Sequence, residues 1–137
     1  MTSAKDSDQQ PLSDLPQSFR DERIELEQAG IAEWSHLREL NDAELSRLAR
    51  SGRASPRNLK RLRAIAALVC DLQLPAPDAA LLMHAGIASS AALAASTPER
   101  VVQQTGRLER SLGTGRPEVV DLFTARKWIQ RARQLRN

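Results

Sequence analysis

The segment LEQAGI at residues 26–31 returns as LMHAGI at residues 82–87, 56 positions further along the chain. In each copy an alanine and a glycine precede an isoleucine. This order is typical of a helix that ends in a Schellman turn, because glycine adopts the left-handed conformation easily and the next apolar residue folds back on the last helical turn. We therefore predict a helix over about residues 18–29 and another over about residues 79–85.

Other features repeat at similar spacing. Leu37 and Leu93 are also 56 positions apart, as are Asn41 and Thr97, two residues suited to a helix N-cap. The segments LARSGR at 48–53 and VQQTGR at 102–107 match at a spacing of 54. The apolar positions of two long helices match at a spacing of 60, which pairs Leu59 with Val119, Leu62 with Leu122 and Val69 with Ile129.

These matches predict a tandem duplication, with repeat one at about residues 15–73 and repeat two at about residues 74–137. A half of roughly 60 residues buries little core alone, so we expect the two repeats to pack as a single domain over residues 15–137. Residues 1–14 are polar and are predicted to form a flexible tail.

Helix start signals are frequent, and no segment has the alternation of a strand. Residues 41–44 form a capping box, and Ser55-Pro56 begins a helix that runs to about Leu72. Thr97-Pro98 begins another, which Gly106 is expected to end. The last helix is predicted over about residues 117–135, with Val119, Val120, Leu122, Phe123, Trp128, Ile129 and Ala132 facing inward. The predicted fold class is all-α.

Composition excludes several classes of protein. The 137 residues (15.1 kDa) are 41% hydrophobic and 27% charged, as in soluble globular proteins. No apolar stretch approaches the roughly 18–20 residues of a membrane helix, and the first residues lack the apolar core of a secretory signal. We expect a cytoplasmic protein without membrane contact. Aromatic residues make up only 3%, which argues against platforms of stacked rings for single-stranded nucleic acid.

The sequence offers no catalytic constellation. There is one cysteine, Cys70, and the two histidines, His36 and His84, differ in their place within the repeat, so no metal-ligand spacing arises. No glycine loop matches a phosphate or dinucleotide fingerprint. We expect a protein that is not an enzyme, with no catalytic residue, metal, cofactor or small-molecule substrate.

Several residues that could suggest chemistry are better explained by structure. Cys70 is predicted to be a buried small hydrophobe, and Asp78 a first-turn acid. His84 precedes a helix end, where a cation is favoured by the helix dipole. Trp34 and Trp128 are predicted to fill the interface between the repeats, whereas an exposed Trp34 would indicate a protein contact.

Charge is unevenly distributed. Residues 1–45 carry 4 basic and 11 acidic side chains, and residues 46–137 carry 16 basic and 6 acidic. This asymmetry favours a polyanion or an acidic protein as partner of the second part. The excess of arginine (17, against 3 lysines) is equally typical of compositional drift in a GC-rich genome. The basic residues fall mainly in two clusters: Arg47, Arg50, Arg53, Arg57, Lys60, Arg61 and Arg63, and then Arg126, Lys127, Arg131, Arg133 and Arg136.

Four stretches carry a resemblance to a known family: residues 71–72 (DL), 79–87 (AALLMHAGI), 93–98 (LAASTP) and 127–135 (KWIQRARQL). At its repeated turns the chain resembles tandem helix-hairpin-helix proteins. More closely, it is similar to a bacterial family catalogued as domain of unknown function 4332, over about residues 12–135. That family has no settled activity, so the resemblance implies a helical fold and suggests nucleic-acid binding.

In helix-hairpin-helix proteins a glycine–apolar–glycine hairpin precedes a helix. Its backbone N–H groups and the helix dipole hold a DNA phosphate without reading sequence. At two expected positions, residues 15–17 (LPQ) and 74–76 (LPA), glycine is missing and proline removes a donor, which implies loss of phosphate binding. The other pair, residues 51–53 (SGR) and 105–107 (TGR), keeps glycine beside arginine.

This second pair and the cations that follow it supply the candidate nucleic-acid-binding residues: Ser51, Gly52, Arg53, Arg57, Lys60, Arg61, Thr105, Gly106, Arg107 and Arg110. The simpler interpretation is that Gly52 and Gly106 only provide turns with positive φ. A single exposed face shared by the cations at 53, 57, 60, 61 and 107 would favour binding, and scattered cations would count against it.

Two functions stay open. The first is a non-catalytic module that binds the backbone of DNA or RNA without sequence preference, and the surviving Gly-Arg turns and the arginine run favour it. The second is a helical interaction or adaptor protein that has lost nucleic-acid binding and holds a protein partner. The two lost hairpins and the acidic first part favour that alternative. We favour nucleic-acid binding.

Overall fold

A computed structural model describes residues 11–12, 19–112 and 120–135, and the secondary structure of these residues is helical apart from an isolated bridge between Pro11 and Glu33. In chain order the helices are α2 (Arg20–Gln28), α3 (Trp34–Arg38), α4 (Asp42–Leu48), the 3-10 turn η3 (Ala49–Ser51), α5 (Pro56–Leu72), α6 (Ala76–His84), α7 (Ser90–Ala94), α8 (Pro98–Leu112) and α9 (Leu122–Gln134). The all-α prediction is confirmed for this part of the chain.

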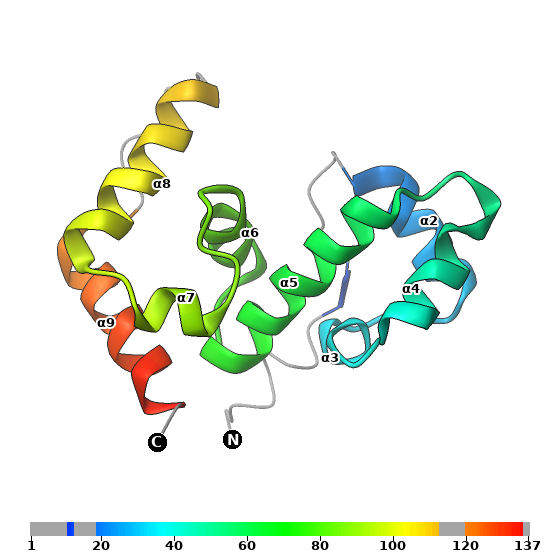
Figure 1. Cartoon of the computed structure of the whole chain (residues 1–137), viewed down its shortest axis with the longest axis horizontal. Helices are drawn as coiled ribbons and strands as arrows, with labels where there is room; N and C mark the ends of the chain where they lie inside the picture. The colour runs from blue at the N-terminus through cyan, green and yellow to red at the C-terminus, as the bar shows by residue number, and fades with distance from the viewer. Residues whose placement is uncertain (1–10, 13–18, 113–119, 136–137) are drawn as a thin grey trace.

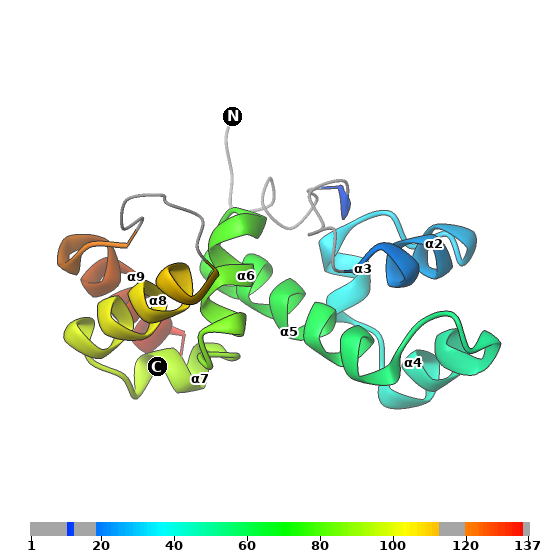
Figure 2. The same cartoon turned by 90° about the horizontal axis from the view of Figure 1, so that it is seen from above.

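Helix α5 is the centre of the arrangement. It contacts α3 and α4 on one side and α6, α7 and α9 on the other. Figures 1 and 2 show α2, α3 and α4 gathered at one end of the molecule and α6 to α9 at the other, with α5 running between them. The buried hydrophobic residues of both ends form one continuous cluster.

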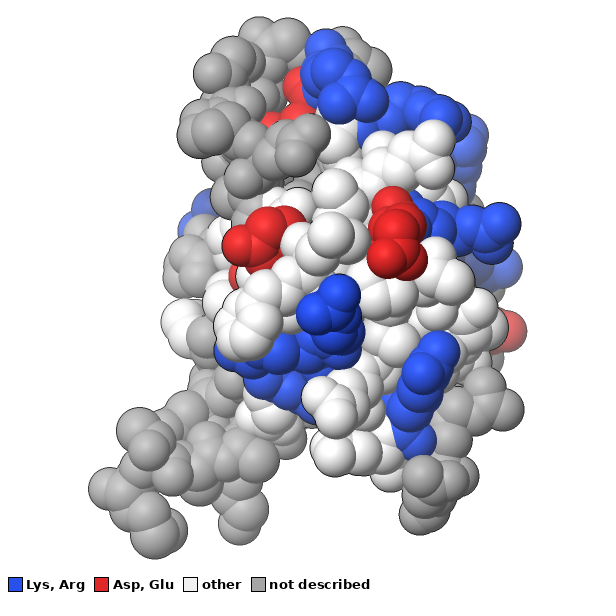
Figure 3. All heavy atoms as spheres, turned by 90° about the vertical axis from the view of Figure 1, so that its left-hand side faces the viewer, with Lys and Arg blue, Asp and Glu red and all other residues white. Residues whose placement is uncertain are grey.

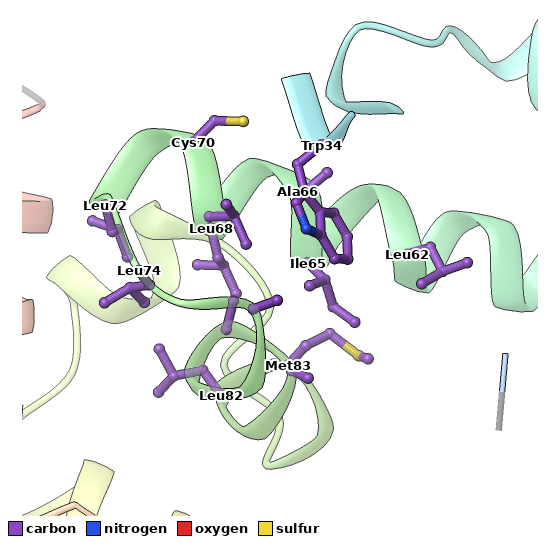
Figure 4. Close-up of a cluster of buried hydrophobic side chains, with 14 of the residues drawn as sticks. Trp34, Leu62, Ile65, Ala66, Leu68, Cys70, Leu72, Leu74, Leu82 and Met83 are labelled. Atoms are coloured by element: carbon purple, nitrogen blue, oxygen red, sulfur yellow. The ribbon is translucent and has the colours of Figure 1, made fainter. Parts of the chain in front are cut away.

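The core is built on the apolar face of α5, where Leu59, Leu62, Ile65 and Val69 are fully buried. Figure 4 shows Trp34 of α3 reaching toward Ala66 of this helix. Trp34 is 0% exposed and Trp128 is 6% exposed, so neither ring is available to a partner. Cys70 is buried, as predicted.

The two glycine stops have the predicted Schellman geometry. Gly30 has φ +79° and Gly86 has φ +98°. The Ile31 N–H donates to the Leu26 carbonyl at 2.9 Å, and the Ile87 N–H donates to the Leu82 carbonyl at the same distance. Both helices therefore end as their sequences predict, because the required conformation is purely local.

The predicted helix starts at Asn41, Ser55 and Thr97 are also confirmed. Asn41 and Glu44 form the reciprocal capping box, with bonds of 2.8 and 2.9 Å. Ser55 Oγ accepts from the Asn58 N–H at 3.3 Å, and Thr97 Oγ1 accepts from the Arg100 N–H at 3.2 Å.

The helix that begins at Pro98 does not end at Gly106, so that prediction is wrong. Helix α8 continues through Gly106 to Leu112. Val101, Thr105 and Glu109 are buried at helical spacing, and Thr105 Oγ1 donates to the Val101 carbonyl at 2.8 Å. Burial of this face outweighs the cost of glycine inside a helix, which is about 1 kcal/mol.

The start of the last helix also differs from the prediction. Asp121 caps α9, with its carboxylate accepting from the Thr124 N–H at 2.8 Å, so the helix begins at Leu122. Residues 117–119 lie outside the described residues. With this start, Leu122 is 43% and Phe123 is 66% exposed, whereas both were expected inside. Trp128, Ile129 and Ala132 face inward as predicted.

Most of the predicted polar tail lies outside the described residues. Within it, Leu12 is 5% exposed, and its N–H donates to the Ala32 carbonyl at 3.0 Å. This residue of the predicted tail is therefore attached to the core, while the domain boundary near residue 15 stays a prediction.

Candidate nucleic-acid interface

The turn between α4 and α5 has the geometry predicted for residues 51–53. Gly52 has φ +82°, and its N–H donates to the Ala49 carbonyl at 3.0 Å. Three residues later Ser55 caps α5. The first cluster of cations therefore surrounds a tight turn that leads into the longest described helix.

Gly52→Ala is expected to lower the free energy of unfolding by about 1 kcal/mol, since an L residue is strained at this φ. A methyl group there would meet no atom within 4 Å, so the cost is conformational rather than steric. Asparagine tolerates the left-handed region, so Gly52→Asn is expected to cost less. Urea denaturation of both variants measures the difference. Equal stability of Gly52→Ala and the unaltered chain would contradict the left-handed conformation described for Gly52.

Backbone donors of this turn are already engaged. The Arg53 N–H donates to Ser51 Oγ at 3.2 Å, and the Ser55 N–H donates to Glu22 Oε2 at 2.8 Å. Asn58 Nδ2 donates to the other oxygen of Glu22 at 3.4 Å. Glu22 is only 2% exposed. Its carboxylate therefore lies at the N-terminus of α5, where a phosphate would be expected, and hydrogen bonds from Arg53 and Ser55 are not available to a ligand.

A second acid of α2, Glu25, contacts the side chains of Ser51 and Arg53 in the turn. Glu25 Oε1 accepts from Ser51 Oγ at 3.0 Å and lies 3.8 Å from Arg53 Nη1. Neither Glu22 nor Glu25 was predicted from the sequence to contact this turn. Glu22 lies in the first turn of α2, where the helix dipole already explains an acid, and Glu25 lies in the middle of that helix, so no sequence signal distinguished them.

The free cations of the first cluster lie on α4, η3 and α5. Arg57 and Lys60 are exposed and Arg61 is half-buried, and the i, i+3, i+4 spacing puts them on one side of α5. Arg47 and Arg50 are also exposed. No ion pair or hydrogen bond links the side chains of these five residues to any described residue, whereas Arg53 forms an ion pair with Glu25. This group is called the α5 basic cluster below.

The predicted second turn at residues 105–107 is absent, because those residues are helical. Thr105, Gly106, Arg107 and Arg110 all belong to α8. Figures 1 and 2 show α8 at the opposite end of the molecule from α4 and the start of α5. The ten candidate residues therefore fall into two groups, one at the Gly52 turn and the start of α5 and the other on α8, and this separation counts against a single binding face that includes Arg107.

Arginines of the sequence clusters also hold the fold together. Arg63 Nη1 donates to the Leu40 carbonyl at 3.1 Å, and its other nitrogen lies 2.8 Å from Asp42. Arg131 Nη1 donates to the Leu72 carbonyl at 2.6 Å, and Arg133 Nε donates to the Ala94 carbonyl at 3.1 Å. Cations that meet helix C-terminal carbonyls are favoured by the helix dipole. Figure 3 shows that Lys and Arg nevertheless outnumber acids on the end of the molecule formed by α8 and α9.

His84, the last residue of α6, interacts electrostatically with Arg61 of the α5 basic cluster. Its ring stacks on Phe19 with centroids 5.9 Å apart. Burial is the larger cause that lowers the pKa of His84 below its ordinary value, and the positive charge of Arg61 lowers it further. The sequence predicted a favoured cation at this helix end, but these surroundings favour the neutral ring.

The lowered pKa of His84 makes stability depend on pH. The folded chain binds this proton more weakly than the unfolded chain, whose histidine pKa is about 6.5. Stability therefore decreases as pH falls through that value. We expect the difference in melting temperature between the unaltered chain and His84→Gln to change against the unaltered chain as the pH is lowered from about 8 to about 5. Arg61→Gln should make this change smaller. A change in favour of the unaltered chain at acidic pH would contradict this account.

None of the helices in residues 19–112 and 120–135 is both long and apolar enough to cross a membrane. Over the same ranges, no three His, Cys, Asp or Glu residues are placed to hold a metal ion.

The described residues thus define an all-helical protein with two Schellman turns and a basic surface at a glycine turn. The chain belongs to the family described as Domain of unknown function (DUF4332), whose family model matches residues 16–135. No curated protein and no solved structure was found to match it.

Proposed function

We propose that the chain is a non-catalytic module of tandem helix-hairpin-helix type that binds the phosphate backbone of nucleic acid, foremost duplex DNA, without reading sequence. The observation that carries the proposal is the α5 basic cluster, five cations with no partner among the described residues beside a glycine turn. When such cations contact a nucleic acid, they displace counterions condensed on its phosphates, and this release of counterions favours binding.

Similar element lengths support the tandem duplication that the proposal includes. Helices α2 and α6 each have nine residues and begin 56 positions apart, at Arg20 and Ala76. Helices α3 and α7 each have five residues and keep that spacing. In addition, α3 packs on α5 as α7 packs on α9.

The mode of contact differs from that of the hairpin family. Because Glu22 and Ser51 engage the N–H groups of Ser55 and Arg53, phosphates would be held by the side chains of Arg57, Lys60 and Arg61 instead. Such contacts are electrostatic and carry no base specificity.

The test is a titration of the chain against a labelled duplex of ~30 base pairs at about 50 and 200 mM salt. Three phosphate contacts predict an affinity that falls about 40-fold between these salt concentrations. Arg57→Ala/Lys60→Ala/Arg61→Ala should weaken binding at least about tenfold at the lower salt. Arg57→Lys/Arg61→Lys, which keeps the charge, should retain most of the affinity. Arg100→Ala/Arg107→Ala removes two exposed cations from α8 and serves as the control for a loss of positive charge elsewhere on the surface. Undiminished binding by the triple variant would overturn the proposal.

One observation favours the adaptor function as a second candidate. A pocket of about 420 Å³ lies between α2, α3 and α4, with Ala29, Ile31, Leu40 and Leu48 in its apolar part and Glu25, Glu44, His36 and Arg47 among its polar residues. Apolar side chains beside charged groups of both signs suit an amphipathic protein segment. Absence of duplex binding at low salt would favour this alternative.

A further inference from the structure

The outward face of α9 presents the one exposed Phe or Trp ring of the chain. The sequence contains two Phe, two Trp and no Tyr. Phe19, Trp34 and Trp128 are buried, whereas Phe123 is 66% exposed. A large apolar ring left in solvent costs hydrophobic free energy, so its surroundings indicate what it could meet.

The register of α9 explains the exposure. Ala125, Trp128, Ile129 and Ala132 face the core, so Phe123 and Lys127 fall on the opposite side of the helix. Lys127 Nζ lies 5.3 Å from the centroid of the Phe123 ring, within the range of a cation–π contact. An aromatic ring and a cation thus stand together in solvent.

The surface around this pair is suited to an anion. A depression of about 190 Å³ on the same helix is lined by Lys127, Gln130, Arg131 and Gln134, which all carry N–H donors. The chain has no acid after Asp121, and the carboxylate of Asp121 is engaged with Thr124. Hydrogen bonds from Thr124 lower the pKa of Asp121.

We propose that α9 binds single-stranded nucleic acid, with one unpaired base stacked on Phe123 and an adjacent phosphate held by Lys127, Gln130 and Arg131. Phe123 and Lys127 are one turn apart, about 6 Å along the helix, and Arg131 follows one turn later. Arg131 donates one N–H to the Leu72 carbonyl and carries further donors for a phosphate. Composition argues against a platform of several rings, but a single ring is sufficient for one base.

A protein partner fits this surface less well. An apolar anchor of a peptide needs a pocket with apolar walls, and the depression lined by Lys127 and its neighbours on α9 has no apolar side chain in its lining. A base supplies a flat π-face together with a linked phosphate, which matches the ring and the donors.

The inference extends the proposed nucleic-acid binding from duplexes to single strands, and the residues on α9 that it uses are different from those of the α5 basic cluster. The predicted spacing of 60 between the long helices pairs buried Leu62 with Leu122, which is 43% exposed, whereas the caps Ser55 and Asp121 are 66 positions apart. Counted from these caps, Lys60 and Arg61 hold the same helix positions as Arg126 and Lys127. Each helix therefore places two adjacent cations in its second turn. Because the residues differ, loss of duplex binding at α5 and loss of strand binding at α9 can be measured independently.

The experiment compares a labelled strand of ~12 thymidine nucleotides with a strand of equal length whose bases are absent, by fluorescence anisotropy at about 50 mM salt. Both strands carry the same phosphates, so a difference in affinity reports contacts to bases. The unaltered chain should bind the base-bearing strand about tenfold more tightly. Phe123→Leu should remove this preference, and Phe123→Trp should keep it. Arg57→Ala/Lys60→Ala/Arg61→Ala should also keep it, whatever happens to duplex binding.

Three results would overturn the inference: equal affinity of the unaltered chain for both strands, a preference that survives in Phe123→Leu, or no binding of either strand. Tighter binding to a Phe-containing acidic peptide of equal charge would assign the surface to a protein partner and also overturn it. Because Phe123 is exposed, Phe123→Leu should melt within a few degrees of the unaltered chain, which separates binding from folding.

Discussion

Trp34→Ala is expected to lower the free energy of unfolding by about 3–5 kcal/mol, the largest effect we predict for a single substitution. The ring is fully buried where α3 packs on α5, with Ala66 nearby (Figure 4). Its removal would leave a cavity lined by rigid helices that cannot close it. Urea denaturation at neutral pH, followed by circular dichroism, measures the loss.

Trp34→Phe is the matched control. The Trp34 Nε1 atom is buried and has no hydrogen-bond partner among the described residues. Phenylalanine removes this unsatisfied donor while it keeps most of the apolar contact, so the two effects partly cancel. We expect a loss of about 1–2 kcal/mol, well below that of the alanine variant. Equal losses for both variants would contradict the packing described here.

Glu22→Ala is expected to lower the free energy of unfolding by about 2–3 kcal/mol. The side chain is buried, and its two oxygens accept from the Ser55 N–H and from Asn58 Nδ2. Without them, the half-buried N–H of Ser55, the N-cap of α5, would lose its acceptor at the point where the glycine turn meets the helix.

Glu22→Gln separates hydrogen bonding from charge. Its single amide oxygen can still accept from the Ser55 N–H at the N-terminus of α5, but it carries no negative charge for the helix dipole. We expect its stability to lie between that of the unaltered chain and that of Glu22→Ala, measured in the same denaturation experiment. If Glu22→Ala unfolded at the same urea concentration as the unaltered chain, the buried carboxylate would have no structural role.

The features that were predicted correctly depend on neighbours in the sequence. The turns at Gly30 and Gly86 need only an alanine, a glycine and an isoleucine in order. The cap at Ser55 is equally local, since it bonds to Asn58, three positions away. Such features survive in almost any tertiary context.

The features that were missed depend on distant parts of the chain. Residues 51–53 and 105–107 have the same small-residue–glycine–arginine pattern, yet only Gly52 forms a turn, because burial of Val101, Thr105 and Glu109 keeps the helix intact at Gly106. Tertiary burial therefore overrides local propensity at Gly106. The exposure of Phe123 is different, because it accompanies a local signal that was missed: the cap that Asp121 forms with Thr124, three positions away, starts α9 at Leu122.

The candidate site was predicted in part. The sequence identified the turn at Gly52 and the cations that follow it. It could not separate Arg57 and Lys60, which have no partner in the part of the chain that the structure describes, from Arg53, which pairs with Glu25. Nor could it show that Glu22, 33 positions before Ser55, would take the backbone donor of the predicted phosphate site. A charge pattern in the sequence includes every charged side chain, whereas binding of a polyanion depends on the cations that have no ion-pair partner within the protein.

The salt dependence of duplex binding tests the central claim most directly. The logarithm of the association constant of the unaltered chain and of Arg57→Ala/Lys60→Ala/Arg61→Ala should be plotted against the logarithm of salt concentration. If the three cations each contact a phosphate, the slope of the triple variant will be shallower by about 2.7. Parallel lines would contradict the claim that the α5 basic cluster meets the nucleic-acid backbone.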